Sequence, residues 1–388
     1  VPMASSAHKT EEEKKEFFDP PDVIDSKVRR LAKWIRKSKH FIGFTGAGVS
    51  TSCGIPDFRS GYNTVLPTGP GAWEELAKQQ KANRTHVVNI TEAIPSPTHM
   101  CFVKLIEEGI MKFLVSQNVD GLHRKSGIHP SKLAELHGNI YVEKCKTCTK
   151  EYLRDYEVRT NEHVHRHETG KRCDNRECNG ELIDTIINFH ENLDPDVINA
   201  GFANGRNADL CLCMGSSLRV TPAANIPLET KKKGGKLVIV NLQRTPLDDS
   251  ADIVIHSFCD TVMEKLMEIL NLEIPRFKIV RYLKVSKVTD KGRCQIGVEG
   301  IDSDETPFSY LKRVTAKYSG NKVRLRREPF VINDEDISGL VELSLKFQGH
   351  YGEPRLQLSI DADKLVEHVL KFEYDPFEGE WISLTAVR

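Results

Sequence analysis

The sequence predicts an α/β fold built on a doubly wound parallel sheet, with a small cysteine-containing module and a C-terminal, all-β, sandwich-like domain. Short apolar runs alternate with helical patterns up to about residue 274, and this alternation requires crossover connections and therefore parallel strands. Two close cysteine pairs interrupt the alternation between residues 145 and 178. After residue 275, alternating apolar and polar segments are divided by Gly, Pro and Asp turns, which is typical of an antiparallel sandwich.

The composition restricts the class of protein. The 55 Lys and Arg residues balance 55 Asp and Glu residues, so any contact with nucleic acid or membrane must be local. No apolar run approaches the ~18 residues that a membrane span requires, and residues 1–16 are polar. We therefore expect a soluble intracellular protein, in which the ten cysteines are metal ligands or buried thiols rather than disulfides.

The 388 residues divide into four predicted regions: a mobile N-terminal arm over 1–24, an α/β domain over 25–144 and 179–274, a cysteine module over 145–178, and a β-rich domain over 275–388. The predicted helices of the α/β domain are 26–39, 97–108, 221–233 and 260–270, and its predicted strands are 41–44, 112–115, 209–214, 237–240 and 252–255. The clearest strand patterns of the β-rich domain are 323–327, 341–347 and 355–360.

A glycine-rich loop follows the first predicted strand. It reads Gly46-Ala47-Gly48-Val49-Ser50 and continues into Gly54-Ile55-Pro56-Asp57-Phe58-Arg59. At the end of a strand, glycine lets the backbone approach a diphosphate, and a following helix offers unpaired N–H groups. A glycine cluster alone is more often a simple turn, but the specific continuation favours nucleotide binding.

A second polar loop, Gln117-Asn118-Val119-Asp120-Gly121-Leu122-His123, ends the strand near residue 115. Polar side chains at the carboxyl ends of parallel strands line the ligand site of doubly wound sheets, although Asn and Asp also satisfy their own backbone in ordinary loops. His137 comes soon after this loop and directly before the cysteines. Because imidazole suits proton transfer near neutral pH, this position favours a site role over that of an ordinary surface histidine.

The four cysteines Cys145, Cys148, Cys173 and Cys178 form two close pairs. Four thiolates grouped in this way bind one Zn²⁺ tetrahedrally and leave no position for an activated water, so the sequence predicts a structural zinc ribbon. Three histidines between the pairs could replace a cysteine, but we interpret them as surface residues; they are His163, His165 and His167.

Two later strand ends complete the set of candidate loops. One strand ends in Gly215-Ser216-Ser217, whose hydroxyls can hold phosphate or ribose oxygens, and another ends in Asn241-Leu242-Gln243. The usual dinucleotide fold places an acidic residue about twenty positions after the glycines to bind the ribose. Here we expect an amide from a different strand to bind it.

Together these motifs resemble the sirtuin family of NAD-dependent protein-lysine deacylases over residues 20–274. The motifs occur in the family order: Gly-Ala-Gly-x-Ser, Gly-Ile-Pro-Asp-Phe-Arg, Gln-Asn-Val-Asp-Gly-Leu-His, His-Gly-Asn, paired cysteines, Gly-Ser-Ser and Asn-Leu-Gln. Residues 115–118, 133–139, 238–243 and 272–275 resemble the class IV branch, and residues 165–170 and 184–186 are most similar to its seventh mammalian member, a chromatin-associated enzyme. The resemblance implies a Rossmann-like NAD-binding catalytic domain with a zinc-ribbon domain.

The resemblance also implies a role for each matching position. The residues implied to bind NAD are Gly46, Ala47, Gly48, Thr51, Asp57, Phe58, Arg59 and Trp73 on the phosphate and ribose side, Gln117, Asn118, Asp120 and His137 around the nicotinamide ribose, and Gly215, Ser216, Ser217, Asn241, Leu242, Gln243 and the backbone at Cys259 on the adenosine side. Asn118 and His137 are the implied catalytic residues. His137 is expected to act as general base on the ribose hydroxyls.

The implied reaction removes an acyl group from a lysine of a protein substrate, a histone or other chromatin protein, in the nucleus. Its products would be nicotinamide, O-acyl-ADP-ribose and free lysine. Two alternatives stay open: a protein mono-ADP-ribosyltransferase or NAD hydrolase that uses the same pocket, and a non-catalytic chromatin-binding scaffold. The intact His137 and the complete Gln117–Asp120 loop argue against the scaffold.

Two regions depart from the family pattern. Residues 60–72 are longer than the short link of class IV relatives, which leaves the placement of Trp73 open. The C-terminal domain lies outside the resemblance. Its Arg324, Arg326 and Arg327 could contact nucleosomal DNA or acidic histone surfaces, but a solvated strand face is the simpler interpretation, and Lys231-Lys232-Lys233 suit a helix C-terminus.

Overall fold

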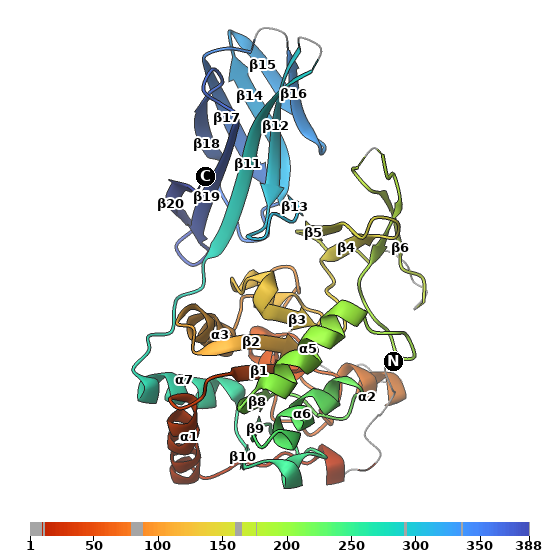
Figure 1. Ribbon diagram of the computed structural model, residues 1–388, viewed down its shortest axis with the longest axis vertical. Helices are drawn as coiled ribbons and strands as arrows, with labels where there is room; N and C mark the ends of the chain where they lie inside the picture. The colour runs from red at the N-terminus through yellow and green to blue at the C-terminus, as the bar shows by residue number, and fades with distance from the viewer. Residues whose placement is uncertain are drawn as a thin grey trace. The chain divides into compact units, whose positions relative to one another are not determined.

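The structure, a computed structural model, describes residues 10, 12–78, 88–159, 165–175, 177–290, 293–334 and 337–387. The chain divides into two compact units (Figure 1). The first unit contains Val1–Ile140 and Thr185–Phe277, and the second contains Tyr141–Asp184 and Lys278–Arg388. The cysteine module therefore shares a unit with the C-terminal β domain.

A six-stranded parallel sheet forms the centre of the first unit, in the order β10-β9-β8-β1-β2-β3. The chain runs outward from β1 to β3 on one side and then returns to the other side of β1 for the last three strands. The predicted doubly wound sheet is thus confirmed, and its topological switch point lies between β1 and β8. The strands are β1 (Phe41–Thr45), β2 (Met111–Ser116), β3 (Leu133–Glu135), β8 (Leu210–Met214), β9 (Lys236–Val240) and β10 (Ile253–Ile255).

Helices cover both faces of this sheet. The helices α5 (Pro195–Asn207) and α6 (Ile226–Lys232) contact each other and pack on the face that carries Phe44 and Cys213. A second group lies on the opposite side in Figure 1 and contains α1 (Pro21–Ile35), α3 (Pro97–Glu107) and α7 (Cys259–Leu270). Two short helices, α2 (Ala72–Lys78) and α4 (Leu122–Lys125), follow the first two strands. None of the helices in the described ranges has the length and apolar character that crossing a membrane requires.

The first helix begins earlier than the sequence indicated. The predicted range was 26–39, but α1 begins at Pro21 and ends at Ile35. Pro21 occupies the first helical position, where its fixed φ is already helical and its missing N–H costs no hydrogen bond. The Pro20-Pro21 pair was therefore wrongly interpreted as part of an arm, because the same residue type that breaks a helix interior also starts helices.

The cysteine module folds as a sheet in the order β13-β5-β4-β7-β6. Its own strands are β4 (Val142–Cys145), β5 (Glu151–Arg154), β6 (Glu168–Arg172) and β7 (Glu181–Asp184). The fifth strand, β13 (Phe308–Ser309), comes from the C-terminal domain and pairs in parallel with β5. The Leu153 amide continues this contact by donating to the Pro307 carbonyl at 2.8 Å.

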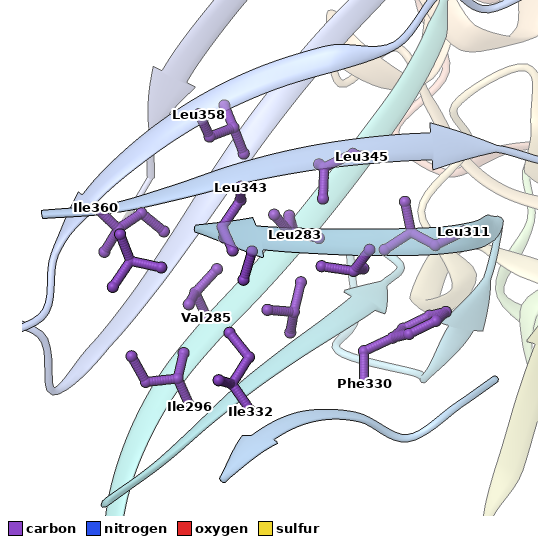
Figure 2. Packing of buried hydrophobic residues seen from close by; sticks show 14 of the residues in the cluster. Leu283, Val285, Ile296, Leu311, Phe330, Ile332, Leu343, Leu345, Leu358 and Ile360 are labelled. Carbon is purple, nitrogen blue, oxygen red and sulfur yellow. The ribbon is translucent and has the colours of Figure 1, made fainter. Parts of the chain in front are cut away.

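The C-terminal domain is an antiparallel sandwich of two sheets, which confirms the predicted all-β fold. One sheet has the order β16-β12-β11-β19-β20 and the other β15-β14-β17-β18. Figure 2 shows the buried core between them, in which Leu283 and Val285 of the first sheet face Leu343 and Leu345 of the second. The strands are β11 (Ile279–Asp290), β12 (Arg293–Ile301), β14 (Leu311–Tyr318), β15 (Asn321–Leu325), β16 (Phe330–Asp334), β17 (Leu340–Phe347), β18 (Leu356–Asp361), β19 (Glu367–Asp375) and β20 (Glu380–Ala386).

Candidate functional site

Most of the predicted site residues lie on the loops at the carboxyl ends of β1, β2, β3, β8 and β9, which we call the carboxyl-end loops. The loops after β1 and β8 touch at the switch point, where the Gly48 amide donates to the Gly215 carbonyl at 2.8 Å. A Cβ atom on Gly48 would lie 2.7 Å from the Cα atom of Gly215, and one on Gly46 would lie 2.7 Å from the Gly215 oxygen. Only glycine allows this approach, so the contact leaves bare backbone where the two loops meet.

Ser50 links the loops that follow β1 and β2. Its hydroxyl donates to Asp120 Oδ2 at 2.7 Å and accepts from Asn118 Nδ2 at 3.2 Å. All three side chains are buried. The Asp120 carboxylate also accepts from the Leu122 amide at 2.9 Å, which fixes the start of α4. Asn118 and Asp120 are thus held in one orientation by a residue that the sequence analysis quoted in a motif but did not single out.

Two further hydrogen bonds join these loops to the loop after β8. Gln117 Nε2 donates to the Ser216 hydroxyl at 2.6 Å, and Arg59 Nη1 donates to the Ser217 hydroxyl at 3.2 Å. The Arg59 side chain is buried, yet its Nη2 has no hydrogen-bond partner among the described residues. Burial and the nearby positive charge of Arg219 lower the pKa of Arg59 to about 10.

Against the effect of burial, the negative charge of Asp57 raises the pKa of Arg59, but among the described residues its carboxylate forms no hydrogen bond or ion pair with the guanidinium. The Asp57 carboxylate accepts from the backbone amides of Arg59 and Ser60 at 3.1 and 2.9 Å, and so shapes the loop. Burial raises the pKa of Asp57, while the hydrogen bonds from Ser60 and Arg59 oppose that shift. The guanidinium therefore keeps one buried donor, Nη2, for which an acceptor is still needed.

Trp73 lies beside Arg59 and contacts two further aromatic rings. Phe58 and Phe189 both lie 5.1 Å from the Trp73 ring, and the Arg59 guanidinium lies 4.6 Å above it. The long segment 60–72 does not displace Trp73, because the Ala72 and Trp73 amides donate to the Asp57 and Phe58 carbonyls at 2.9 and 3.1 Å. The two ends of segment 60–72 therefore lie next to each other, and its extra length does not move Trp73. Nothing in the sequence around Phe189 marked it as a site residue.

His137 follows β3 and is oriented by the loop after β2. Its Nδ1 lies 2.9 Å from the Gln117 carbonyl oxygen, and a carbonyl can only accept, so Nδ1 carries the proton. Nε2 therefore keeps its lone pair, and it is buried without a partner among the described residues. Burial lowers the pKa of His137 to about 4, although the bond to Gln117 opposes the shift. The ring is thus neutral near pH 7 and offers a basic nitrogen.

Gly138 allows the backbone next to His137 to lie close to the backbone of Thr185. Its φ is +82°, and a Cβ atom there would lie 1.8 Å from the Thr185 carbonyl oxygen. Asn139 is held to the same segment, since its amide donates to Thr185 Oγ1 at 3.1 Å. The Gly in the His-Gly-Asn motif is therefore required by conformation and by space.

The loop after β9 adjoins the loop after β8, since the Gly215 amide donates to the Val240 carbonyl at 2.9 Å. Its Asn241 side chain donates to the Gln243 carbonyl, and Gln243 Nε2 donates to the Lys14 carbonyl at 3.2 Å. Part of the predicted mobile arm is thus hydrogen-bonded to this loop, with the Phe17 amide donating to the Leu242 carbonyl at 2.9 Å.

The remaining residues predicted to bind the cofactor are Thr51, Ala47 and Cys259. Thr51 is buried and donates to the Gly48 carbonyl at 3.1 Å, beside Ala47 at the start of a short 3-10 turn. Cys259 is the first residue of α7. Burial raises the pKa of its thiol, which therefore stays protonated and unreactive at neutral pH.

The four predicted metal ligands come together in the second unit. The Sγ atoms of Cys145, Cys148, Cys173 and Cys178 lie within 4.8 Å of one another, with 3.6 Å between Cys145 and Cys178 and 3.6 Å between Cys148 and Cys173. Zinc–sulfur bonds of about 2.3 Å in a tetrahedron place sulfurs about 3.8 Å apart, so this set fits one zinc ion. The amides of Thr147 and Cys148 point at the Cys145 sulfur, as a thiolate requires.

The histidines of the module lie outside this cluster. His165 is exposed, and His167 lies 3.0 Å from Asp184 through Nδ1. His163 lies outside the described residues. Cys145 and Cys173 are buried, Cys178 is partly exposed and Cys148 is exposed, so one side of the cluster is open to solvent.

Comparisons with known proteins agree with this geometry. A family model described as the Sir2 family matches residues 46–222. The NAD-dependent protein deacetylase SRT1 of Arabidopsis thaliana is 40% identical over 328 residues, covering 82% of this chain and 67% of the relative. Sirtuin-7 of Bos taurus is 41% identical over 68% of this chain and 64% of its own length, and Sirt6 of Drosophila melanogaster is 38% identical over 68% of this chain and 81% of its own.

A solved Sir2 structure with a deacetylated p53 peptide and 3'-O-acetyl-ADP-ribose covers 64% of this chain and all of its own, at 29% identity and a TM-score of 0.50. The chain spans about two thirds of the length of the SRT1 and sirtuin-7 relatives. A match to 82% of the chain must extend past residue 274, so the similarity to SRT1 includes part of the C-terminal domain, which the sequence analysis had left outside the resemblance.

Proposed function

The chain belongs to the Sir2 family, and on that premise we propose that it is an NAD-dependent protein-lysine deacylase. The acyl group of a modified lysine is transferred to ADP-ribose, and nicotinamide and free lysine are released. Bound NAD supplies the ribose that accepts the acyl group, and one water is consumed in the net reaction.

The single observation that carries this proposal is the state of His137. Its Nδ1 proton is committed to the Gln117 carbonyl, and its Nε2 lone pair is buried without a described partner. A neutral imidazole with one nitrogen fixed and the other available is suited to accept a proton from a hydroxyl. Gln117 and Asn118 follow in the same loop, so the base is aligned by the residues expected to hold the nicotinamide ribose.

The residues around the switch point fit a dinucleotide. Gly46, Gly48 and Gly215 leave backbone that no Cβ covers, and Arg59 presents a buried Nη2 without a described partner. A diphosphate provides the negative charge and the acceptor oxygens that this guanidinium needs. Ser216, Ser217, Asn241 and Gln243 supply hydroxyl and amide groups for the adenosine half, and Phe58, Trp73 and Phe189 exclude water from the neighbouring ribose.

Several finer features complete the proposal. The substrate is an acyl-lysine of a histone or another chromatin protein, the enzyme acts in the nucleus, and it belongs to the class IV branch. The similarity to sirtuin-7 and Sirt6 supports the branch and substrate class. The four-cysteine cluster binds one structural Zn²⁺, which its sulfur spacing supports.

The decisive experiment replaces the base. His137→Tyr should reduce deacylation of an acetylated histone peptide at least a hundredfold while NAD still binds, because only the proton acceptor is lost. Both products are followed by mass spectrometry, and NAD binding by calorimetry. His165→Tyr is the matched control, since it makes the same change at an exposed position and should leave turnover unchanged.

The same product analysis separates the other activities. Nicotinamide release with ADP-ribose attached to protein would identify a mono-ADP-ribosyltransferase, and release without peptide would identify an NAD hydrolase. Wild-type protein that binds NAD but turns over none of these substrates would identify a scaffold. Retained deacylation by His137→Tyr would remove His137 from the mechanism.

Metal content has its own test. Purified protein should contain one zinc per chain by elemental analysis, and Cys148→Ala should lose it. A zinc-free wild type that retains its fold would contradict the structural role.

A further inference from the structure

The sheet β15-β14-β17-β18 of the sandwich has one face in the core and one face turned outward. Val314, Ala316, Leu343 and Leu345 point inward, and Figure 2 labels Leu343 and Leu345. Because side chains alternate along a strand, the residues between them lie on the outer face. The outer face therefore carries Arg313, Thr315 and Lys317 on β14, Lys322 and Arg324 on β15, Leu340, Glu342, Ser344 and Lys346 on β17, and Gln357, Ser359 and Asp361 on β18.

Positive charge gathers at one end of this face. Arg313 pairs across the ladder with Lys346, and Arg324 pairs with Thr315. Arg326 directly follows β15, and Arg355 directly precedes β18. We call these five residues, Arg313, Arg324, Arg326, Lys346 and Arg355, the basic face.

The basic face is not neutralised by its own protein. None of its five side chains forms a hydrogen bond or an ion pair with another residue in the part of the chain that the structure describes. Partial burial, followed by the positive charges of Arg355, Arg324 and Arg326, lowers the pKa of Arg313. Lys317, on the same strand, does have an acidic partner, Glu342, at 3.5 Å. The charge is thus segregated, in a chain whose Lys and Arg equal its Asp and Glu at 55 each.

Mutual repulsion of this kind costs folding free energy, so a bound polyanion would relieve it. Arginine supplies a planar fork that binds phosphate in a bidentate manner, and the neighbouring Thr, Ser and Gln side chains are typical phosphate donors. Four strands at about 4.8 Å spacing spread the five charges over about 14 Å, which compares with the ~12 Å width of the major groove between two phosphate backbones.

The outer face favours duplex over single-stranded nucleic acid. Single strands are bound through aromatic side chains on which bases stack. The outward positions of β14, β15, β17 and β18 that the structure describes carry charged, hydroxyl and amide side chains, apart from the apolar Leu340, and no aromatic ring. A surface of cations and hydroxyls without stacking platforms matches the outside of a double helix.

We propose that the basic face of the C-terminal sandwich binds the phosphate backbone of double-stranded DNA without sequence preference. This binding is separate from the chemistry proposed for the first unit and does not depend on it. It also replaces the simpler interpretation of Arg324 and Arg326 as part of a solvated strand, because Arg313, Lys346 and Arg355 join them on one surface.

The test measures binding of the full chain to a fluorescein-labelled 20-base-pair duplex by anisotropy, from 50 to 200 mM salt. The quadruple variant Arg313→Gln, Arg324→Gln, Arg326→Gln, Arg355→Gln should bind at least tenfold more weakly. Since each neutralised phosphate contributes about 0.9 to the slope of log K against log salt, the slope should become shallower by about 2 to 4. The corresponding quadruple Lys variant should keep most of the affinity.

The matched control removes four positive charges from exposed positions of the first unit, Lys33→Gln, Lys37→Gln, Lys232→Gln and Lys233→Gln, and should change the affinity less than twofold. Equal losses in both quadruple variants would overturn the proposal, because the binding would then follow net charge alone. Absence of duplex binding by the wild type would overturn it too. So would preference for an acidic peptide or a single strand over the duplex.

Two measurements keep the result interpretable. The Gln variant should unfold at a temperature no lower than that of the wild type, because the changed side chains form no hydrogen bond or ion pair with described residues and their mutual repulsion is removed. Deacylation of a short acetylated peptide should also be unchanged. A variant that loses DNA binding but keeps peptide turnover separates this surface from the proposed catalytic function, and failure of peptide turnover in the wild type would leave the DNA result standing.

Discussion

Arg59 in the first unit and Arg281 in the second are equally buried, with 6% of each residue exposed, but their surroundings differ. Arg281 Nη2 lies 3.2 Å from Asp155 and 3.5 Å from Glu353. Burial alone would lower the pKa of Arg281, but these two carboxylates outweigh it and raise the pKa. Burial instead lowers the pKa of Arg59, the positive charge of Arg219 adds to this shift, and the Asp57 carboxylate offsets it only in part.

The difference separates a structural charge from a functional one. Arg281 joins the cysteine module, through Asp155, to the sandwich loop that carries Glu353, and the rings of Phe308 and Tyr310 lie 4.9 and 5.1 Å from its guanidinium. Its positive charge is paired within the protein, although its Nε has no hydrogen-bond partner among the described residues. Arg59 has no such ion pair among the described residues, and its buried Nη2 lacks a hydrogen-bond partner that a ligand at the switch point can supply. A buried arginine without an ion pair thus indicates a binding site, and a buried arginine with ion pairs indicates a structural link between two parts of the unit.

The largest effect on stability should come from removing Arg281 and with it both of its ion pairs. Arg281→Met leaves two buried carboxylates without a cation, so the free energy of unfolding should fall by about 3–5 kcal/mol, as measured by urea titration. The triple variant Arg281→Met, Asp155→Leu, Glu353→Leu removes all three charges and should recover much of the loss. A single variant as stable as the wild type would show that Arg281 does not join the two parts of the unit.

Replacing Arg59 should change the stability less than replacing Arg281, but it should weaken NAD binding strongly. Arg59→Met should raise the Kd for NAD at least tenfold, about 1.4 kcal/mol, while the free energy of unfolding changes by less than about 1 kcal/mol. Calorimetry and urea titration measure the two quantities. Arg326→Met, at an exposed site, is the control. If Arg59→Met unfolded like Arg281→Met and still bound NAD, the distinction between the two arginines would fail.

The smallest effect concerns pH and the buried histidines of the first unit. Burial lowers the pKa of His99 and of His123, whose rings are 4.7 Å apart, and lowers that of His137 to about 4. Unfolded histidine titrates near 6.5, so below that pH the unfolded chain takes up protons that the folded chain does not. The stabilisation that comes from keeping these histidines neutral is therefore fully present above pH 6.5. It decreases as the pH falls from about 6.5 toward 4.

This pH dependence can be measured by urea titration at pH 7, 6 and 5 with zinc in excess. His99→Gln should reduce the slope by up to about 1.4 kcal/mol per pH unit, because one of the titrating groups is gone. An unchanged slope would mean that His99 is protonated in the folded chain. The exposed His129→Gln is the control, and it should leave the slope as it is.

Structural features that follow from patterns among nearby residues in the sequence were predicted well. The parallel sheet, the sandwich and the four-cysteine cluster were all predicted, because strand periodicity and ligand spacing are local properties. The start of α1 was wrong, since Pro21 has two opposite meanings that only the fold distinguishes. Contacts formed across long separations, such as Phe189 beside Trp73, had no local signal.

The sequence by itself therefore determined the chemical groups and the strand ends on which they lie. Tertiary structure decided which groups meet: that Ser50 bridges Asn118 and Asp120, that β13 completes the sheet of the cysteine module, and that Arg313 and Arg355 join Arg324 on one surface. The physical reason is that propensity and periodicity act over a few residues. Pairing register, burial and unmet charge arise only when distant segments are packed together.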